Sequence, residues 1–555
     1  MRPEQDLLGI LADARDRART LHGWNSGPER IYDLLRTATK VRAMEISAGV
    51  TTDVPWESVL GQLVAWHHDQ PVGTGACSEE DAAEIVLAAV AAQRFDPLEA
   101  SIRSGVYEVH MTRGDFRVRH RWDASAEVAD MLLEQDARPT SVPPLSDAER
   151  KWISSQVVGS RSGPPLEVLE AAVQRAAATI EVYRQSVPEG QVPDSFQLGE
   201  GMTAGDMTSV LAVITGIASL SEHTAHRLSR LEATLAHMPT SQLLAVIAEM
   251  CPNVSEAHQA LVVERLTYRP GRSCRTSPLI SHDGVVIICP PLLTPRAVDA
   301  IMLRSATHAP GGFGRIGREQ GARATAWADW LRAAPGALVA ERVPAARTDG
   351  GSAGDLDVVV VDPARRLGLC LEIKWPIEAL SLHEGMKVES WISSAARQLD
   401  RLRGELRSGA ASARLPRSWP SFDSISWTWC VGTPQQLTTR PLPVPDMHAT
   451  SLRYVQALGT PPDLGSLVTA LRSPDLPARG VHFGVRKRSI SVGRHRVHVD
   501  ALGIRTSSWR PRFGERVSLD IDCLTRHVNS SGQPAEPLRA RCLCVLSGRR
   551  YIPCR

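Results

Sequence analysis

The sequence has few lysines and few aromatic residues, and it has no long uninterrupted hydrophobic run. Its longest apolar stretch, residues 210–220, is interrupted by Thr215, Gly216 and Ser219 and falls short of the roughly 18 residues that a membrane-spanning helix needs. The chain begins Met-Arg-Pro-Glu-Gln-Asp, with acids where a signal peptide would carry a basic patch before an apolar run. We therefore predict a cytoplasmic protein with no membrane contact.

Net charge and cysteine spacing exclude further classes of protein. The 63 Lys and Arg residues nearly cancel the 61 Asp and Glu residues, so any nucleic-acid surface must be local. The ten cysteines form neither a disulfide framework nor a zinc ribbon, since the densest group, Cys523 to Cys554, lacks a C-x2-C knuckle. Because 43% of the 555 residues are hydrophobic, the chain should fold into roughly three or four domains with cores of their own.

Familiar motifs for nucleotide and zinc binding are missing or misplaced. There is no G-x-x-x-x-G-K-[ST] and no H-E-x-x-H, so His223 and His226 are interpreted as ordinary helix residues. Residues 312–317 read G-F-G-R-I-G and match G-x-G-x-x-G, but the segment before them is polar and ends in Pro310, where dinucleotide binding requires a buried strand. We expect no nucleotide cofactor.

Hydrophobic spacing divides the chain into five regions. Leucines at helical spacing predict a helical domain over residues 1–145, interrupted by a strand-like interval at 106–118 and followed by a proline-rich linker. The other four regions are a second helical region, a short β-containing connector, an α/β domain and a basic β-rich C-terminal region, over residues 146–265, 266–310, 311–460 and 480–555. In the connector, Asp283-Gly284 predicts a hairpin between residues 266–268 and 285–289.

Two adjacent strands of the α/β domain carry the residues most informative about chemistry. Residues 354–362 and 367–375 are rich in valine and leucine, and the segment Asp-Pro-Ala-Arg-Arg between them supplies a turn. Because side chains alternate along a strand, Asp355 and Asp357 share one face of the first strand. Glu372 and Lys374 share one face of the second in the same way.

These side chains predict a cation site. Carboxylates about 4 Å apart repel by several kcal/mol at an effective dielectric constant near 20, so the cluster makes sense if a cation lies between them. Oxygen ligands with open positions favour Mg²⁺ or Mn²⁺. Lys374 is one of only five lysines, against 58 arginines, which indicates a specific role.

Asp357 followed by Glu372-Ile373-Lys374 resembles the signature of the PD-(D/E)xK nuclease superfamily, an acid on one strand and E-x-K on the next. The resemblance covers about residues 312–460 and implies a restriction-endonuclease-like α/β/α domain with a mixed sheet. It also implies that Asp357, Glu372 and the backbone carbonyl of Ile373 hold a divalent metal and that Lys374 orients the attacking water. The implied activity is magnesium-dependent hydrolysis of phosphodiester bonds in DNA, as in restriction or phage defence.

The resemblance extends to the order of elements, which in this superfamily is helix, three strands, helix, strand. We expect the first helix over residues 317–334, with Glu319 facing inward as a further metal ligand, and the first strand over residues 338–343. The second helix is expected over residues 391–406, with Trp391 buried and Gln398 at the edge of the apolar stripe. Superfamily members often carry such a glutamine, which positions water or phosphate, so Gln398 is a candidate catalytic residue. One branch has a tyrosine four residues later, where this chain has Leu402; the closing strand is expected over 425–431.

A local excess of basic residues lies between residues 479 and 516, with Trp509 and Phe513 among them. On strands it could follow a phosphate backbone, and it could equally be the solvated face of a small β domain. The candidate nucleic-acid-binding residues are Arg486, Lys487, Arg488, Arg494 and Arg496.

The predicted function is a metal-dependent nuclease with DNA as its substrate. The helical N-terminal half is a candidate for binding a partner protein or for regulation. The alternative is a catalytically inactive protein of the same fold that binds nucleic acid or acts as a scaffold. In a third interpretation, the helical half carries the function and the α/β domain only docks it.

Overall fold

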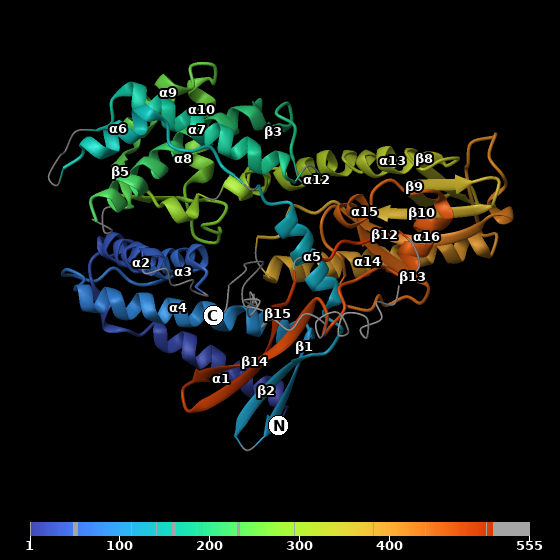
Figure 1. The fold of residues 1–555 in the computed structure, drawn as a ribbon, viewed down its shortest axis with the longest axis horizontal. Coiled ribbons are helices and arrows are strands. Elements are labelled where there is room, and N and C mark those ends of the chain that lie inside the picture. The colour runs from blue at the N-terminus through green and yellow to red at the C-terminus, as the bar shows by residue number, and fades with distance from the viewer. Residues whose placement is uncertain are drawn as a thin grey trace, which may run out of the picture.

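The computed structural model is a mixed α/β protein, with about 49% of residues in helices and 20% in strands (Figure 1). The expected combination of helices, mixed sheets and β-strands near the C-terminus is confirmed. The structure describes residues 2–47, 54–112, 114–139, 141–157, 163–187, 189, 191–229, 234–293, 295–380, 382–438, 440–506 and 508–513. The C-terminal part of the predicted basic region, including Arg516 and the cysteines from Cys523 to Cys554, lies outside these residues.

The N-terminal helices pack around a core of leucine, isoleucine and tryptophan side chains. These helices are α1 (Pro3–Ala18), α2 (Arg30–Ser47), α3 (Trp56–Asp69) and α4 (Glu79–Arg103). Leu34, Leu63 and Trp66 are fully buried between them. The same core includes Ile280 and Ile287 of the predicted connector, so residues from two predicted regions share one core.

A second group of helices is built around α8, which contacts α7 closely because Gly216 has no side chain. A Cβ atom at Gly216 would lie 3.1 Å from the backbone of Ala172. The helices are α6 (Asp147–Ser155), α7 (Leu166–Gln185), α8 (Ala204–Arg227), α9 (Thr240–Met250), α10 (Glu256–Leu266) and α11 (Val298–Thr307). The helix before them, α5 (Ser125–Asp136), packs instead against the C-terminal half of the chain. Short strands accompany them: β3 (Gln197–Gly199), β4 (Met202–Thr203), β5 (Ala236–Pro239), β6 (Leu279–His282) and β7 (Val285–Ile288).

By length and composition alone, α8 is apolar enough to cross a membrane. This apolar character was not predicted, because only the apolar stretch at residues 210–220 was compared with the length of a membrane span. However, 61% of the most apolar part of α8 is buried by the rest of the protein. Such burial is typical of a helix in a protein core.

The predicted hairpin at Asp283-Gly284 is present, but its first strand was misplaced. Both turn residues have positive φ angles, 47° and 76°, as a two-residue hairpin turn of this type requires. Across this turn β7 pairs with β6, and on its other side it pairs with β5. Leu266, where the first strand was expected, instead ends helix α10.

The C-terminal half contains a six-stranded mixed sheet with the order β11-β8-β9-β10-β12-β13. Its strands are β8 (Leu338–Arg347), β9 (Ser352–Asp362), β10 (Leu367–Ile373), β11 (Ala411–Ala413), β12 (Ser426–Thr433) and β13 (Met447–Ser451). β8, β9 and β10 are antiparallel, and β12 runs parallel to β10. The first strand, the pair β9–β10 and the closing strand thus occur where the sequence predicted them.

Helices cover both faces of this sheet. They are α13 (Thr325–Arg332), α14 (Leu382–Arg407), α15 (Leu452–Leu458) and α16 (Leu464–Arg472). The preceding helix α12 (Gly312–Ala322) packs against the helical region instead, where its Ile316 is buried. The core on one face includes residues of α14, and the core on the other includes residues of α5, α13, α15 and α16. The expected single helix over residues 317–334 is two helices, because the chain turns between Ala322 and Thr325.

A smaller sheet joins strands from opposite ends of the chain, as Figure 1 shows between α1 and α5. Its strands are β1 (Tyr107–Thr112), β2 (Asp115–His120), β14 (Phe483–Val492) and β15 (His495–Ile504). β2 and β15 pair in parallel, with Val118 beside Val499. The structure therefore unites segments that the sequence analysis assigned to separate regions.

Glu127 of α5 and Glu389 of α14 lie close enough for their charges to interact. Burial, with a smaller effect of Glu389, raises the pKa of Glu127 to about 7. The folded state therefore binds this proton more tightly than the unfolded state, and stability falls as pH rises from about 4.5 to 7. We expect Glu127→Gln to be more stable than wild type at pH 8, by roughly 1–3 kcal/mol, and equal to it near pH 4.

Thermal unfolding of both proteins at the two pH values checks this prediction. A difference between Glu127→Gln and wild type that is the same at pH 4 and pH 8 would contradict it.

Candidate functional site

Asp357 and Glu372 lie side by side where the strands β9 and β10 separate. The antiparallel ladder between these strands ends at the pair Val358–Leu371, so Asp357 and Glu372 stand one position further along. Residues opposite each other in such a ladder point to the same face. The carboxylate of Asp357 then takes the place of a ladder bond, since its Oδ2 accepts a hydrogen bond from the backbone N–H of Ile373 at 2.6 Å.

Lys374 completes this group from the end of β10. Its backbone N–H donates to the carbonyl of Gly432 at 2.9 Å, which attaches the residue to the neighbouring strand β12. Its ammonium donates to Oε1 of Glu372 at 2.6 Å. The Lys374 side chain is 34% exposed, whereas that of Glu372 is 5% exposed, so the group is open to solvent on the lysine side.

Burial dominates the electrostatics of both carboxyl groups. It raises the pKa of Asp357 above its usual value, although the Ile373 N–H and the Lys374 charge oppose the shift. It also raises the pKa of Glu372, against the Lys374 charge and with the support of the Asp357 charge. The ionised form of each carboxyl group is thus less stable than it would be in water. A nearby cation would stabilise the ionised form of both groups.

The residues present fit a divalent cation of the Mg²⁺ class. Their side-chain donors are oxygens of two partly desolvated carboxylates, which are the ligands that Mg²⁺ and Mn²⁺ prefer. No group of three or more His, Cys, Asp or Glu side chains suited to a metal occurs in the described part of the chain. A cation held by the two carboxylates alone would have ligand positions left for water or substrate, as Mg²⁺ commonly does in proteins.

The structure does not bring Glu319 or Gln398 into this group. Glu319 on α12 is exposed, and its neighbour Gln320 is the buried residue. Gln398 on α14 is also exposed, since the buried stripe of that helix passes through Ala395 and Leu399. Glu319 was expected to face inward, which is wrong because α12 turns Ile316 and Gln320 to the interior. Gln398 was expected at the edge of the apolar stripe, and it lies beside the buried Leu399 with its own side chain exposed.

The predicted burial of Trp391 on α14 is also wrong. It was expected to be buried, but it is 45% exposed, and Ile392 is buried in its place. The helix begins at Leu382, earlier than the predicted residue 391.

For the nuclease activity that the sequence predicts, we expect Glu319→Gln and Gln398→Ala to leave the rate of DNA cleavage unchanged, because neither side chain contacts the carboxylate pair. Cleavage rates measured in the same magnesium buffer check this. A loss of more than about tenfold in either variant would place that residue in the site and contradict the arrangement.

The five predicted nucleic-acid-binding residues do not form one patch. Because side chains alternate along a strand, Arg486 and Arg488 lie on the face of β14 that carries the buried Ile490. Lys487 and Arg496 are exposed on the opposite face, whose other end is buried through Phe483 and Ile504. Arg494 belongs to the turn between β14 and β15.

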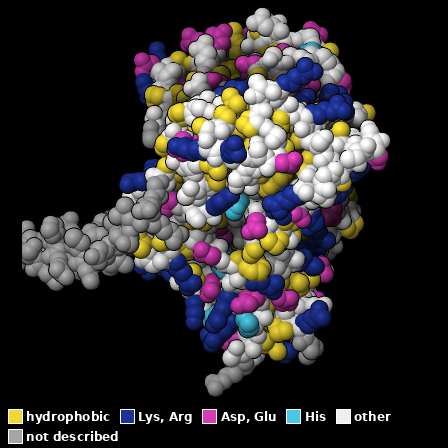
Figure 2. All heavy atoms as spheres, turned by 90° about the vertical axis from the view of Figure 1, so that its right-hand side faces the viewer, with side chains coloured by type: hydrophobic (Ala, Val, Ile, Leu, Met, Phe, Trp, Pro, Cys, Tyr) yellow, Lys and Arg dark blue, Asp and Glu magenta, His cyan; other side chains and the backbone are white. Residues whose placement is uncertain are grey.

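The face of the small sheet that carries Lys487 and Arg496 has acidic as well as basic side chains. Lys487 is paired across the ladder with Asp500, and His498 of β15 is paired with Arg117 of β2. In Figure 2, dark blue Lys and Arg side chains gather in the lower part of the molecule, with magenta acids among them. Arg117 was missed because its pairing with the C-terminal strands cannot be read from the sequence.

Arg323 links the second helical region to the candidate site and also escaped the sequence analysis. Its guanidinium lies 5.2 Å from the ring centroid of Trp375, the residue after Lys374. It also donates to the backbone carbonyls of Glu189 and Gln191. No local motif marks such a contact between residues far apart in sequence.

Comparison with protein-family models, curated proteins and solved structures finds no match for this chain.

Proposed function

We propose that this protein is a divalent-metal-dependent nuclease that hydrolyses phosphodiester bonds in DNA. One observation carries the proposal: Asp357, Glu372 and Lys374 meet at the ends of two adjacent strands, and Asp357 is fixed by the N–H of Ile373. An acid beside E-x-K in this geometry resembles the PD-(D/E)xK superfamily.

The order of elements around the site supports the same proposal. α12 and α13 precede the antiparallel strands β8, β9 and β10, after which α14 and the parallel strand β12 follow. The superfamily arranges helix, three strands, helix and strand in this order. The support concerns the fold, while the activity rests on the side chains themselves.

The chemistry follows from the charges at the site. A divalent cation held by Asp357 and Glu372 would neutralise charge on the phosphate and acidify a water molecule. Lys374 is half-exposed on a flexible stem, so its ammonium can turn from Glu372 towards a phosphate oxygen or the attacking water. In the reaction, water adds to phosphorus, one P–O ester bond breaks, and the leaving oxygen takes up a proton.

The inactive alternative also has an observation in its favour. Glu372 and Lys374 neutralise each other, and Asp357 is satisfied by a backbone N–H. Such a closed set of contacts would serve a purely structural strand end. A protein of this kind would bind nucleic acid or a partner without cutting.

The experiment that separates the two is incubation of wild type with supercoiled, linear and single-stranded DNA in Mg²⁺, Mn²⁺ or EDTA. Cleavage that requires the metal supports the nuclease. Salt-sensitive DNA binding without any cleavage would favour the inactive alternative.

A further inference from the structure

Arg342 has an unusual backbone conformation inside strand β8. Its φ angle is 50°, in the left-handed region that costs roughly 1–2 kcal/mol for a residue other than glycine. The described chain has five other such residues, and they lie at turns or at a helix end: Glu200, Ser229, Asp283, Arg366 and Asp446. Strain of this kind in the middle of a strand is a feature of functional sites.

The strained residue stands directly opposite Asp357. The ladder between β8 and β9 pairs Glu341 with Val358 and Val343 with Leu356 in one continuous register. The pair between them, Arg342 and Asp357, is missing from the ladder. Since the β9–β10 ladder also stops at Val358, Asp357 pairs with neither neighbouring strand.

Charge at the site makes an arginine here useful to an anionic substrate. Asp357 and Glu372 carry two negative charges against the single positive charge of Lys374, and the exposed Asp355 is close enough to act on both carboxyls. Arg342 is exposed, and within the described residues its side chain makes no hydrogen bond or ion pair. Its charge nevertheless acts on Asp357.

We propose that Arg342 binds a phosphate oxygen of the nucleic acid beside the Asp357–Glu372 pair. The proposal rests on the proposed function and adds a substrate-binding residue to it. The guanidinium matches phosphate geometry with two parallel N–H donors, and its charge offsets the repulsion between substrate and carboxylates. The left-handed backbone at Arg342 lies where the ladder between β8 and β9 lacks its pair with Asp357.

Arg342→Gly tests this proposal, because glycine accepts the positive φ angle and only the side chain is lost. Arg366→Gly is the matched control: Arg366 has a φ angle of 51°, is exposed, and lies in the turn at the other end of β9 and β10. Both variants are expected to unfold at or above the wild-type temperature, because glycine relieves the backbone strain at each position. Binding of a fluorescein-labelled DNA duplex is measured in EDTA at several salt concentrations, and KM for its cleavage is measured in Mg²⁺.

Arg342→Gly is expected to weaken binding and raise KM roughly tenfold, and to reduce the slope of log K against log salt by about one. Arg342→Lys restores the slope, and Arg366→Gly matches wild type. If wild type cleaves the duplex and Arg342→Gly has the same KM and salt slope as Arg366→Gly, the proposed role of Arg342 is contradicted. The proposed nuclease activity is then unaffected. A wild type that neither binds nor cleaves the duplex overturns both.

Discussion

Replacing Lys374 with alanine is expected to slow DNA cleavage by about 100-fold or more, because charge developing on the phosphate loses its ammonium partner. Asp357→Asn should be affected at least as strongly. It removes the charge of a cation ligand and leaves a weaker acceptor for the Ile373 N–H. Cleavage rates under single-turnover conditions measure both effects without interference from product release.

Lys387→Ala is the control for Lys374, since Lys387 is an exposed lysine on α14. Its rate should equal that of wild type. The assignment is contradicted if Lys374→Ala and Lys387→Ala cleave equally fast, or if Asp357→Asn retains full activity while folded.

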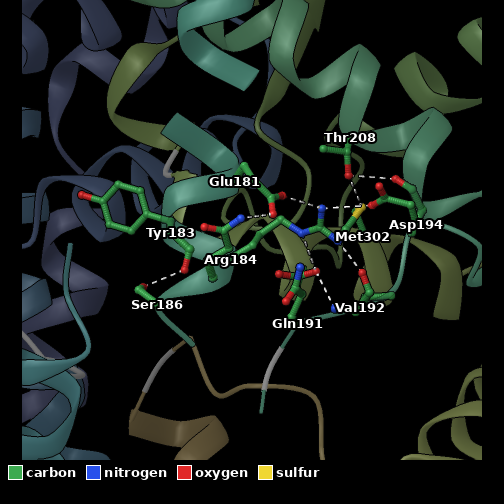
Figure 3. A network of polar contacts seen from close by, with 12 residues as sticks. Glu181, Tyr183, Arg184, Ser186, Gln191, Val192, Asp194, Thr208 and Met302 are labelled. Carbon is green, nitrogen blue, oxygen red and sulfur yellow. Dashed lines mark hydrogen bonds and ion pairs between the residues drawn. The ribbon is translucent and has the colours of Figure 1, made fainter. Parts of the chain in front are cut away.

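Arg184→Met is expected to destabilise the helical region by about 3–5 kcal/mol, because it removes a buried cation that pairs with the largely buried Asp299. Figure 3 shows the Arg184 guanidinium with two further acids, the more exposed Glu181 and Asp194. Its side chain is 3% exposed and lies 3.3 Å from Asp299, 3.0 Å from Asp194 and 3.4 Å from Glu181. It also donates to the carbonyl of Val192.

Asp299 explains why the expected effect is large. Burial raises its pKa to about 6, with Arg184 the strongest opposing influence. Without Arg184 the Asp299 carboxylate would remain buried with the N–H of Val192, at 3.0 Å, as its chief remaining partner. The second substitution Asp299→Asn should therefore recover part of the lost stability in the double variant.

Chemical denaturation of the two single variants and the double variant measures this coupling. Arg332→Met is the comparison, because Arg332 pairs with Asp329 and Glu341 at the surface, where such pairs contribute about 0–1 kcal/mol. Equal losses of unfolding free energy in Arg184→Met and Arg332→Met would contradict the prediction that the buried Arg184 contributes more to stability than a surface ion pair.

Local patterns predicted the strands that form the candidate site. Valine-rich residues 354–362, the turn after Asp362 and the run ending at Lys374 all read correctly as β9, turn and β10, because burial on both faces leaves few alternatives. Parity along these strands then placed Asp357 and Glu372 on one face, which the register bears out.

Helix rotation and long-range pairing could not be predicted in the same way. Trp391 and Ile392 are adjacent apolar residues on α14, and the spacing of the stripe does not decide which of them is buried. Trp391 was expected to be buried, but Ile392 is the buried residue. The pairing of β2 with β15 joins residues about 380 positions apart, and neither strand carries a signal for its partner. The left-handed backbone of Arg342 had no sequence signal either, since arginine does not favour that conformation.

The most direct test of the proposed nuclease measures the rate of DNA cleavage against Mn²⁺ concentration, together with Mn²⁺ binding to the same preparations by calorimetry. We predict that the cleavage rate and the occupancy of the Mn²⁺ site rise together in wild type, and that both are lost in Glu372→Gln. Binding should also strengthen with pH, since the metal competes with protons on carboxyl groups whose pKa values are raised by burial. Wild-type protein that binds no Mn²⁺, or a Glu372→Gln variant that binds the metal and cleaves DNA like wild type, would contradict it.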